Sequence, residues 1–172
     1  LSTTKPYPLQ ASLVSSTEAV LDERNIGANA RIDLDGSLAE IVTSIDAQLN
    51  KALVKGKVVL KPFADSMLGV ADLSAQALNL AELGDDLPKT NINLQLHATE
   101  NGSGTLHIGN SAAGLYDSGR IPLSDLSLSF MQKDNKFVLD PIVVKLGSTQ
   151  QAAGSIHGTG QYADGALNIS LK

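Results

Sequence analysis

Residues 91–108 read NINLQLHATENGSGTLHI, and this stretch decides the fold. Every second side chain of its first half is apolar, at Ile92, Leu94, Leu96 and Ala98. A period of two is typical of a β-strand with one apolar face and one polar face. Residues 101–104, which read NGSG, have the composition of a tight turn, and the alternation resumes at Leu106 and Ile108. The stretch therefore predicts two antiparallel strands joined by a short turn.

The same alternation recurs along most of the chain. Turn residues separate the alternating runs at Asp35-Gly36, Asp117-Ser118-Gly119, Asp134-Asn135-Lys136 and Asp164-Gly165. Short strands joined by such turns favour an antiparallel meander over alternating strands and helices. About 11 strands at ~4.8 Å each extend a sheet by ~50 Å, and open sheets of that size curl or split. The predicted fold is all-β: an elongated, curled antiparallel sheet, a half-pipe or β-taco, with an apolar concave interior.

One face of this sheet supplies the candidate functional residues. They are apolar side chains that share a position in the alternation, and they are expected to line the groove. The candidate groove-lining residues are Ile26, Ile32, Leu34, Ile45, Val58, Leu60, Ile92, Leu94, Leu96, Leu106, Ile108, Leu126, Leu128, Phe130, Val144, Leu167, Ile169 and Leu171.

The segment from Ser37 to Leu53 leaves its local structure open. Its apolar residues follow helical spacing, and Ser37 with Glu40 has the form of a capping box. The same residues also alternate, and the Ile, Val and Thr in the segment favour a strand. We favour the strand. A short helical turn is plausible at Leu80–Leu83, and Pro141 is expected at a bulge or edge because the apolar positions change there from odd to even numbers.

Composition and charge exclude several classes of protein. The 172 residues hold 13 Lys and Arg, 18 Asp and Glu, and no Cys, for a formal net charge of −5. The sequence has no basic patch of the kind that nucleic-acid binding requires, so we exclude a nucleic-acid partner. No disulfide, thiol nucleophile or Cys-ligated zinc is possible. No apolar run is long enough for a spanning helix, and a chain that starts at Leu1 without a signal-like segment is interpreted as one fragment, residues 1–172, of a longer protein.

Candidate catalytic and metal-binding motifs are weak. Residues 158–163, GTGQYA, match the dinucleotide fingerprint by letters, but a turn and a strand follow where the fingerprint needs a helix. The histidines His97, His107 and His157 occupy polar positions of predicted strands, where we expect them to be solvated. Asp33 and Asp35 lack the remaining ligands of a calcium loop and are expected at a hairpin turn. We therefore predict no enzyme activity, no cofactor, no metal site and no catalytic residue.

A more specific signal runs from about Leu60 to Lys172. Its main elements are Lys61-Pro62-Phe63, the segment 79–88, the strand at 92–97 and, most distinctively, Gly104 to Gly114 with Asn110-Ser111-Ala112-Ala113-Gly114, followed by Arg120-Ile121-Pro122-Leu123. Together these resemble the TamB family, the inner-membrane component of the translocation and assembly module. Residues 1–59 resemble the family only through generic alternation.

The resemblance implies a periplasmic protein of a Gram-negative bacterium whose parent is anchored in the inner membrane and meets a TamA-type barrel in the outer membrane. The family belongs to the AsmA-like group, related to bridge-like lipid-transfer proteins, whose apolar groove conducts phospholipids to the outer membrane. The expected partners are thus phospholipid acyl chains and the barrel. The runner-up function is a chaperone or scaffold for outer-membrane protein and autotransporter assembly. Without the resemblance, the same alternation would favour a closed β-sandwich.

Overall fold

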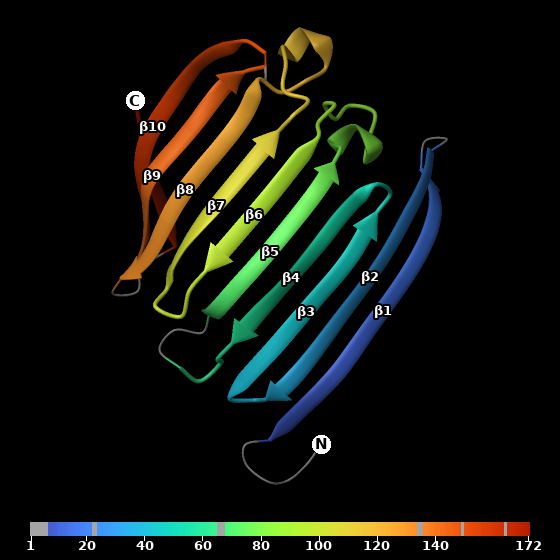
Figure 1. Ribbon diagram of the computed structural model, residues 1–172, viewed down its shortest axis with the longest axis vertical. Coiled ribbons are helices and arrows are strands. Elements are labelled where there is room, and N and C mark those ends of the chain that lie inside the picture. Colours follow the sequence, from blue (N-terminus) through green and yellow to red (C-terminus); the bar gives the residue numbers. More distant parts are fainter. Residues whose placement is uncertain (1–6, 22–23, 65–67, 134–135, 149, 164) are drawn as a thin grey trace.

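The computed structural model describes residues 7–21, 24–64, 68–133, 136–148, 150–163 and 165–172. Eleven strands form a single antiparallel sheet, and each strand pairs with its neighbours along the chain (Figure 1). The strands are β1 (Pro8–Leu21), β2 (Arg24–Ser37), β3 (Glu40–Leu49), β4 (Ala52–Leu60), β5 (Leu68–Leu78), β6 (Ile92–Ala98), β7 (Ser103–Asn110), β8 (Leu123–Lys133), β9 (Lys136–Gly147), β10 (Ala152–Ala163) and β11 (Ala166–Leu171). Two short 3-10 helices lie in the connections, η1 (Leu80–Glu82) and η2 (Tyr116–Ser118). The predicted all-β antiparallel meander is confirmed.

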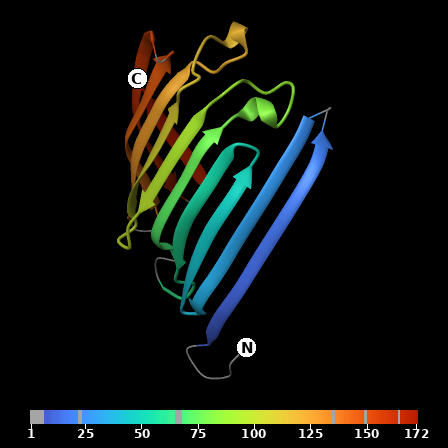
Figure 2. The ribbon, with the colours of Figure 1, turned by 45° about the vertical axis from the view of Figure 1, so that its right-hand side comes forward.

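The sheet is open and curled. Strands β1 and β11 are its two edges, and Figures 1 and 2 show the last strands bending behind β8 and β9. Within the part of the chain that the structure describes, no second layer of strands or helices covers either face. The alternation of polar and apolar residues therefore builds a single-layer sheet and not a sandwich.

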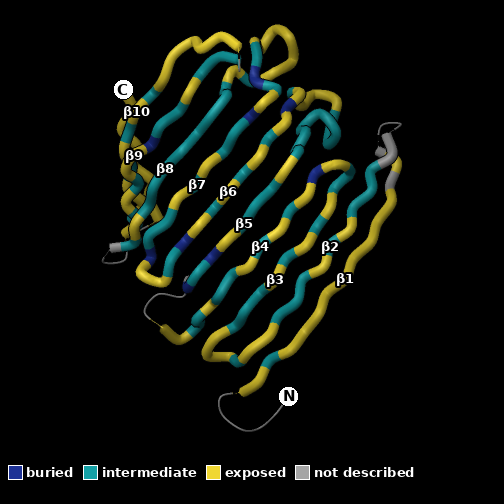
Figure 3. Tube along the Cα trace, viewed as in Figure 1, coloured by how far each residue is buried: buried dark blue, intermediate teal, exposed yellow. Residues whose placement is uncertain are grey.

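Burial follows from this single layer. Among the described residues, the apolar ones that are fully covered are mostly alanines, such as Ala52, Ala71 and Ala98, and the one large member of this group is Ile142. Figure 3 shows half-buried and exposed residues alternating along the central strands, whereas β1 is almost entirely exposed, and it shows no continuous buried layer. The sheet is held together by cross-strand pairs and backbone hydrogen bonds, since it has no closed core.

The ambiguous segment from Ser37 to Leu53 is extended, as favoured. It ends β2, forms β3 and begins β4. Ser37 still accepts hydrogen bonds, from the backbone N–H groups of Ala39 (3.3 Å) and Glu40 (3.4 Å), but it does so in a hairpin turn. The capping-box pattern therefore identified the side chain's hydrogen-bonding role but not the element that it serves. The predicted helical turn near Leu80 is present as η1.

The turns need one correction. Asp35-Gly36 is not a turn: both residues belong to β2, and the hairpin turns at Leu38 and Ala39. The chain stays extended to Ser37 because β2 pairs with β3 as far as the Ser37–Glu40 pair. The predicted turns at residues 134–136 and 164–165 rest on residues outside the described ranges.

Pro141 lies in a bulge, as the change in apolar numbering predicted. Leu128 of β8 pairs with Ile142, whereas Phe130, two residues on, pairs with Leu139, three residues back. The extra residue keeps the apolar side chains of β9 on one face on both sides of Pro141.

The two long connections, between β5 and β6 and between β7 and β8, meet at one end of the strands (Figure 1). The Lys89 N–H donates to the Gly119 carbonyl at 2.8 Å. Thr90 and Asn110, only 4% and 3% exposed, anchor this end. The Thr90 hydroxyl donates to the Leu78 carbonyl and accepts from the Leu80 N–H. The Asn110 amide accepts from the N–H groups of Asn91 and Ala112 and donates to the Leu123 carbonyl.

Candidate functional site

The strand register places the candidate groove residues on one face. Residues that lie directly opposite each other in antiparallel strands share a face, as do residues two apart along a strand. One row of such partners crosses all eleven strands, and we call it the central row: Leu13, Ile32, Ile45, Gly56, Leu73, Leu96, Leu106, Leu128, Ile142, Gly158 and Leu171. The face that carries it is called the apolar face.

All of the predicted groove residues lie on the apolar face. One flanking row contains Leu34, Val58, Phe130 and Ile169, and the row on the other side contains Leu94, Ile108, Leu126 and Val144. Ile26, Leu60, Ile92 and Leu167 extend the face toward the strand ends. Whether these side chains contact lipid is a separate question, and that role stays a prediction.

Three large residues of the central row were not among the candidates, namely Leu13, Leu73 and Ile142. Each belongs to an alternating run, so a signal was present in the sequence. The faces of Leu73 and Ile142 could not be assigned from the sequence, because Gly56 interrupts the row beside Leu73 and the Pro141 bulge precedes Ile142. The strand register places these two residues and Leu13 on the apolar face.

Glycines give the apolar face its local fit. A Cβ at Gly56 would collide with the Leu73 side chain, and a Cβ at Gly104 would collide with the Phe130 ring. A Cβ at Gly158 would lie 2.6 Å from Leu171 Cδ2. A large side chain on one strand therefore lies over a glycine on the next strand, and it fills the space that the missing side chain of the glycine leaves on the apolar face.

The apolar face is half-buried although no described segment of the chain covers it. On β6, Ile92, Leu94 and Leu96 are half-buried, whereas the polar residues between them are exposed. Exposure increases at the edges of the sheet, where Leu13 is 61% and Leu171 55% exposed. The central strands thus shield their apolar side chains by lateral packing, and the edge strands do not.

One polar atom sits within the apolar face without a partner. The Thr43 hydroxyl, between Leu34 and Val58 in a flanking row, is covered and has no hydrogen-bond partner in the described part of the chain. An unsatisfied hydroxyl costs about 1–3 kcal/mol. Because the oxygen is covered, it is not available to a ligand on the surface.

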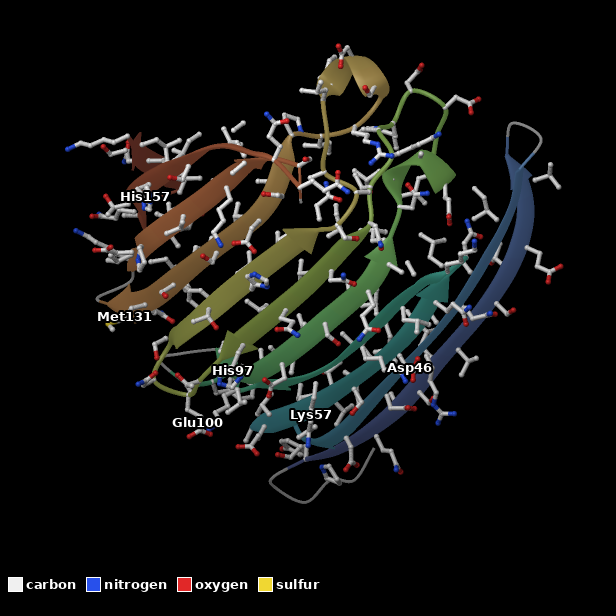
Figure 4. The ribbon with its side chains drawn as sticks, turned by 45° about the horizontal axis from the view of Figure 1, so that its top comes forward. Asp46, Lys57, His97, Glu100, Met131 and His157 are labelled. Atoms are coloured by element: carbon white, nitrogen blue, oxygen red, sulfur yellow. The ribbon has the colours of Figure 1, made fainter. Side chains whose placement is uncertain are left out.

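The opposite face is polar and carries a hollow of about 530 Å³ across β4 to β7, lined by Lys55, Lys57, Asp72, Ser74, Gln95, His97, Thr105 and His107, among others. The His97 Nδ1 lies 2.5 Å from Asp72 Oδ1, and the His107 Nε2 lies 2.7 Å from Asp125 Oδ2. Figure 4 labels Lys57 and His97 on this face. The histidines are exposed, as predicted, and two of them also have a carboxylate partner, which the sequence did not indicate.

Ion pairs elsewhere on the chain shift three pKa values, those of Arg31, Asp33 and Lys61, and the hydrogen bond to Asp33 raises the pKa of Arg31. Arg31 Nε lies 2.7 Å from Asp33 Oδ2, and this hydrogen bond holds the pKa of Asp33 below its usual value, with a further contribution from the Ser12 hydroxyl. The pKa of Lys61 is raised, first by its 2.9 Å hydrogen bond to Glu100 and more weakly by Glu40. These groups are solvent-exposed, so they add little to stability.

Metal-ligating groups do not gather on the part of the chain that the structure describes: it contains no group of three or more His, Asp or Glu side chains that could hold an ion. None of the helices in the described ranges is long and apolar enough to span a membrane. The fold thus defines an open β-sheet with one apolar and one polar face. Comparison of the chain with protein-family models, with curated proteins and with solved structures returned no match.

Proposed function

We propose that this chain is a periplasmic segment of a bridge between the inner and outer membranes, and that its apolar face conducts phospholipids by holding their acyl chains. The observation that carries the proposal is the central row, an apolar path that crosses all eleven strands of a sheet that no other described segment covers. Ten strand spacings of ~4.8 Å give the row a length of ~48 Å. One leaflet contributes ~15 Å to a bilayer core of ~30 Å, so the row is about three acyl chains long.

The curvature of the sheet supports placing this face on the inside. The N–H of Ser111 donates to the carbonyl of Asn91, so the odd-numbered, polar residues of β6 direct their backbone groups toward β7. In Figure 1, β6 runs downward and β7 lies on its left. When the N–H and C=O groups of an L-residue point left on a strand that runs downward, its side chain points toward the viewer. The polar residues of β6 therefore face the viewer, and its apolar residues face away. The last strands bend away from the viewer, toward the apolar side.

The chemistry of the face suits a mobile ligand. Each buried methylene contributes about 0.8 kcal/mol, so contact with part of an acyl chain is favourable. The side chains of the central row are all aliphatic or absent, and they offer no hydrogen bond or charge that would fix a lipid in one place. Because the sheet is open, a headgroup can remain in water while its acyl chains lie on the face.

Photo-crosslinking tests this proposal with matched positions. A photoreactive side chain at Leu96, Leu106 or Leu128 should capture phospholipid, because these residues are consecutive in the central row. Gln95, His107 and Ser127 form the corresponding row on the polar face of the same strands and are the controls. Equal capture of lipid by both rows would refute the proposal.

The periplasmic location and the TamA-type barrel partner rest on the resemblance to the TamB family. They are tested in the full-length parent by fractionation and by co-purification with the barrel. A parent that is not periplasmic, or that does not co-purify with the barrel, would refute that part of the proposal. Acyl-chain binding by the apolar face is tested separately, by the crosslinking.

A scaffold for outer-membrane protein strands is the second candidate. One observation favours it: β11 covers β10 only from His157 onward, so Ala152 to Ile156 have no described strand on their outer side. An incoming strand could pair there by β-augmentation. Crosslinking from Ser155 to a protein, with no lipid captured by the central row, would favour the scaffold over the conduit.

A further inference from the structure

The hollow on the polar face is lined by a grid of side chains from four strands in the middle of the sheet, β4 to β7. Directly opposed residues form two parallel rows: Lys57, Asp72, His97 and Thr105, and, two residues along each strand, Lys55, Ser74, Gln95 and His107. Neighbours in such a grid are ~5 Å apart across the strands and ~7 Å apart along them. All eight residues line the hollow of about 530 Å³, so it is large enough for a small ligand.

The lining of the hollow carries an excess of positive charge. The Lys57 side chain forms no hydrogen bond or ion pair within the part of the chain that the structure describes. Lys55 Nζ lies 3.4 Å from Asp46 Oδ2, in a pair whose two side chains are both 63% exposed. Among the described residues that line the hollow, Asp72 is the one carboxylate, and His97 Nδ1 already donates to it. Two ammonium groups therefore face a single carboxylate, before any protonation of the imidazoles is counted.

Both histidines of the hollow keep one ring nitrogen for a further partner. His97 bonds to Asp72 through Nδ1, and His107 bonds to Asp125 through Nε2 at 2.7 Å. A carboxylate accepts, so the bonded nitrogen carries the proton, and Nε2 of His97 and Nδ1 of His107 are left over. When either ring takes up a second proton, that nitrogen becomes a donor. Asp125 also lies 3.4 Å from Lys145 Nζ, which offsets its charge outside the hollow.

We propose that this hollow binds a phosphate-type oxyanion, held between the two lysines of β4 and the two histidines of β6 and β7. The ammonium groups approach from one side and the imidazoles from the other, with the Ser74 hydroxyl and the Gln95 amide between them. A phosphate group has three or more acceptor oxygens that point in different directions, so it suits donors from several strands better than a planar carboxylate does. The site lies on the face opposite the acyl-chain path, so it does not depend on the proposed conduit.

Imidazole NMR signals test the site with an internal control, because the chain has three histidines and His157, on β10, does not line this hollow. Inorganic phosphate, titrated at constant pH and ionic strength, should shift the signals of His97 and His107 with one saturable dissociation constant and leave those of His157 unchanged. Lys57→Gln should raise that dissociation constant by about tenfold, because it removes a charge-assisted donor. Lys51→Gln removes the same charge from the β3–β4 turn, outside the hollow, and should leave the constant unchanged.

A second arm of the experiment identifies what carries the phosphate group. Binding of inorganic phosphate, without binding to vesicles of phosphatidylcholine and phosphatidic acid, assigns the site to a soluble anion. Sedimentation with those vesicles that Lys57→Gln abolishes and Lys51→Gln preserves, and that vesicles of phosphatidylcholine alone do not support, assigns it to a lipid headgroup. Circular dichroism verifies the fold of both variants. Equal shifts of all three histidines, no binding of either probe, or unchanged binding by Lys57→Gln would overturn the proposal.

Discussion

The ring of Phe130 on β8 lies over Gly104 on β7, in the space that a Cβ at position 104 would occupy. Gly104→Val should therefore destabilise the sheet by about 1–3 kcal/mol, because neither the ring nor the nearby His97 carbonyl can move freely. Urea unfolding followed by circular dichroism measures the change. Gly109→Ala on the same strand is the control: its nearest neighbour would be His107 Cε1 at 3.9 Å, so stability should change little.

Leu128→Arg tests whether the apolar face is open to solvent. A long side chain on an open face can extend its charge to water, so the variant should still fold. A charge in the lipid path costs on the order of 3 kcal/mol, so phospholipid crosslinking beyond position 128 should fall. Ser127→Arg, on the polar face of the same strand, should affect neither property. Complete unfolding of Leu128→Arg would indicate a closed core, and normal lipid crosslinking would count against the conduit.

The Asp33 carboxylate gives a pH-dependent prediction. Its pKa is lowered in the folded state, so its ion pair with Arg31 stabilises the fold above the unfolded pKa of ~3.9 and ceases to do so as the pH falls through the folded value. Asp33→Asn should be slightly less stable than the wild type at pH 7 and equal to it near pH 2. Urea titrations at several pH values measure the difference. A difference that does not depend on pH would show that the carboxylate acts through packing.

Asn110 should be the most sensitive polar position at the loop end of the sheet. Asn110→Ala removes three hydrogen bonds from a buried site and leaves their partners unpaired, so we expect a loss of about 2–4 kcal/mol. Asn91→Ala, which removes an exposed side-chain bond to Ser111, should lose less than 1 kcal/mol. Similar losses for both variants would mean that the buried network does not anchor the connections.

Much of the sheet follows from the alternation, because a period of two determines both the element and its two faces. The β2–β3 hairpin shows what the alternation cannot predict. The β-branched residues after Ser37 favour a strand, but the position of the turn depends on the Ser37 hydroxyl and on the pairing of β2 with β3. The prediction of a turn at Asp35-Gly36 was therefore wrong.

The candidate site could also be predicted only in part. The alternation identifies which residues share a face within one strand, but the pairing of Leu73 with Gly56, or of Ile142 with Gly158, depends on the register between strands. The absence of a second layer over the described sheet could not be derived either, since Leu96 and Leu128 would be equally suited to a sandwich core. The anchoring role of Thr90 and Asn110 is not predicted by the sequence, because nothing local distinguishes them from other polar residues near the strand ends.

The order of the strands in the sheet is their order in the chain, so the length of the sheet increases in proportion to the number of strands. Consecutive strands pair with each other, so the strand pairing itself depends on no contact between distant segments, and the Lys89–Gly119 hydrogen bond joins two connections that lie only one hairpin apart. Inserting or removing one hairpin adds or deletes two positions in every row and leaves the remaining pairs in register, as in repeat proteins. The span of such a sheet can therefore change in steps of ~10 Å, two strand spacings, by events that alter only one hairpin of the gene product.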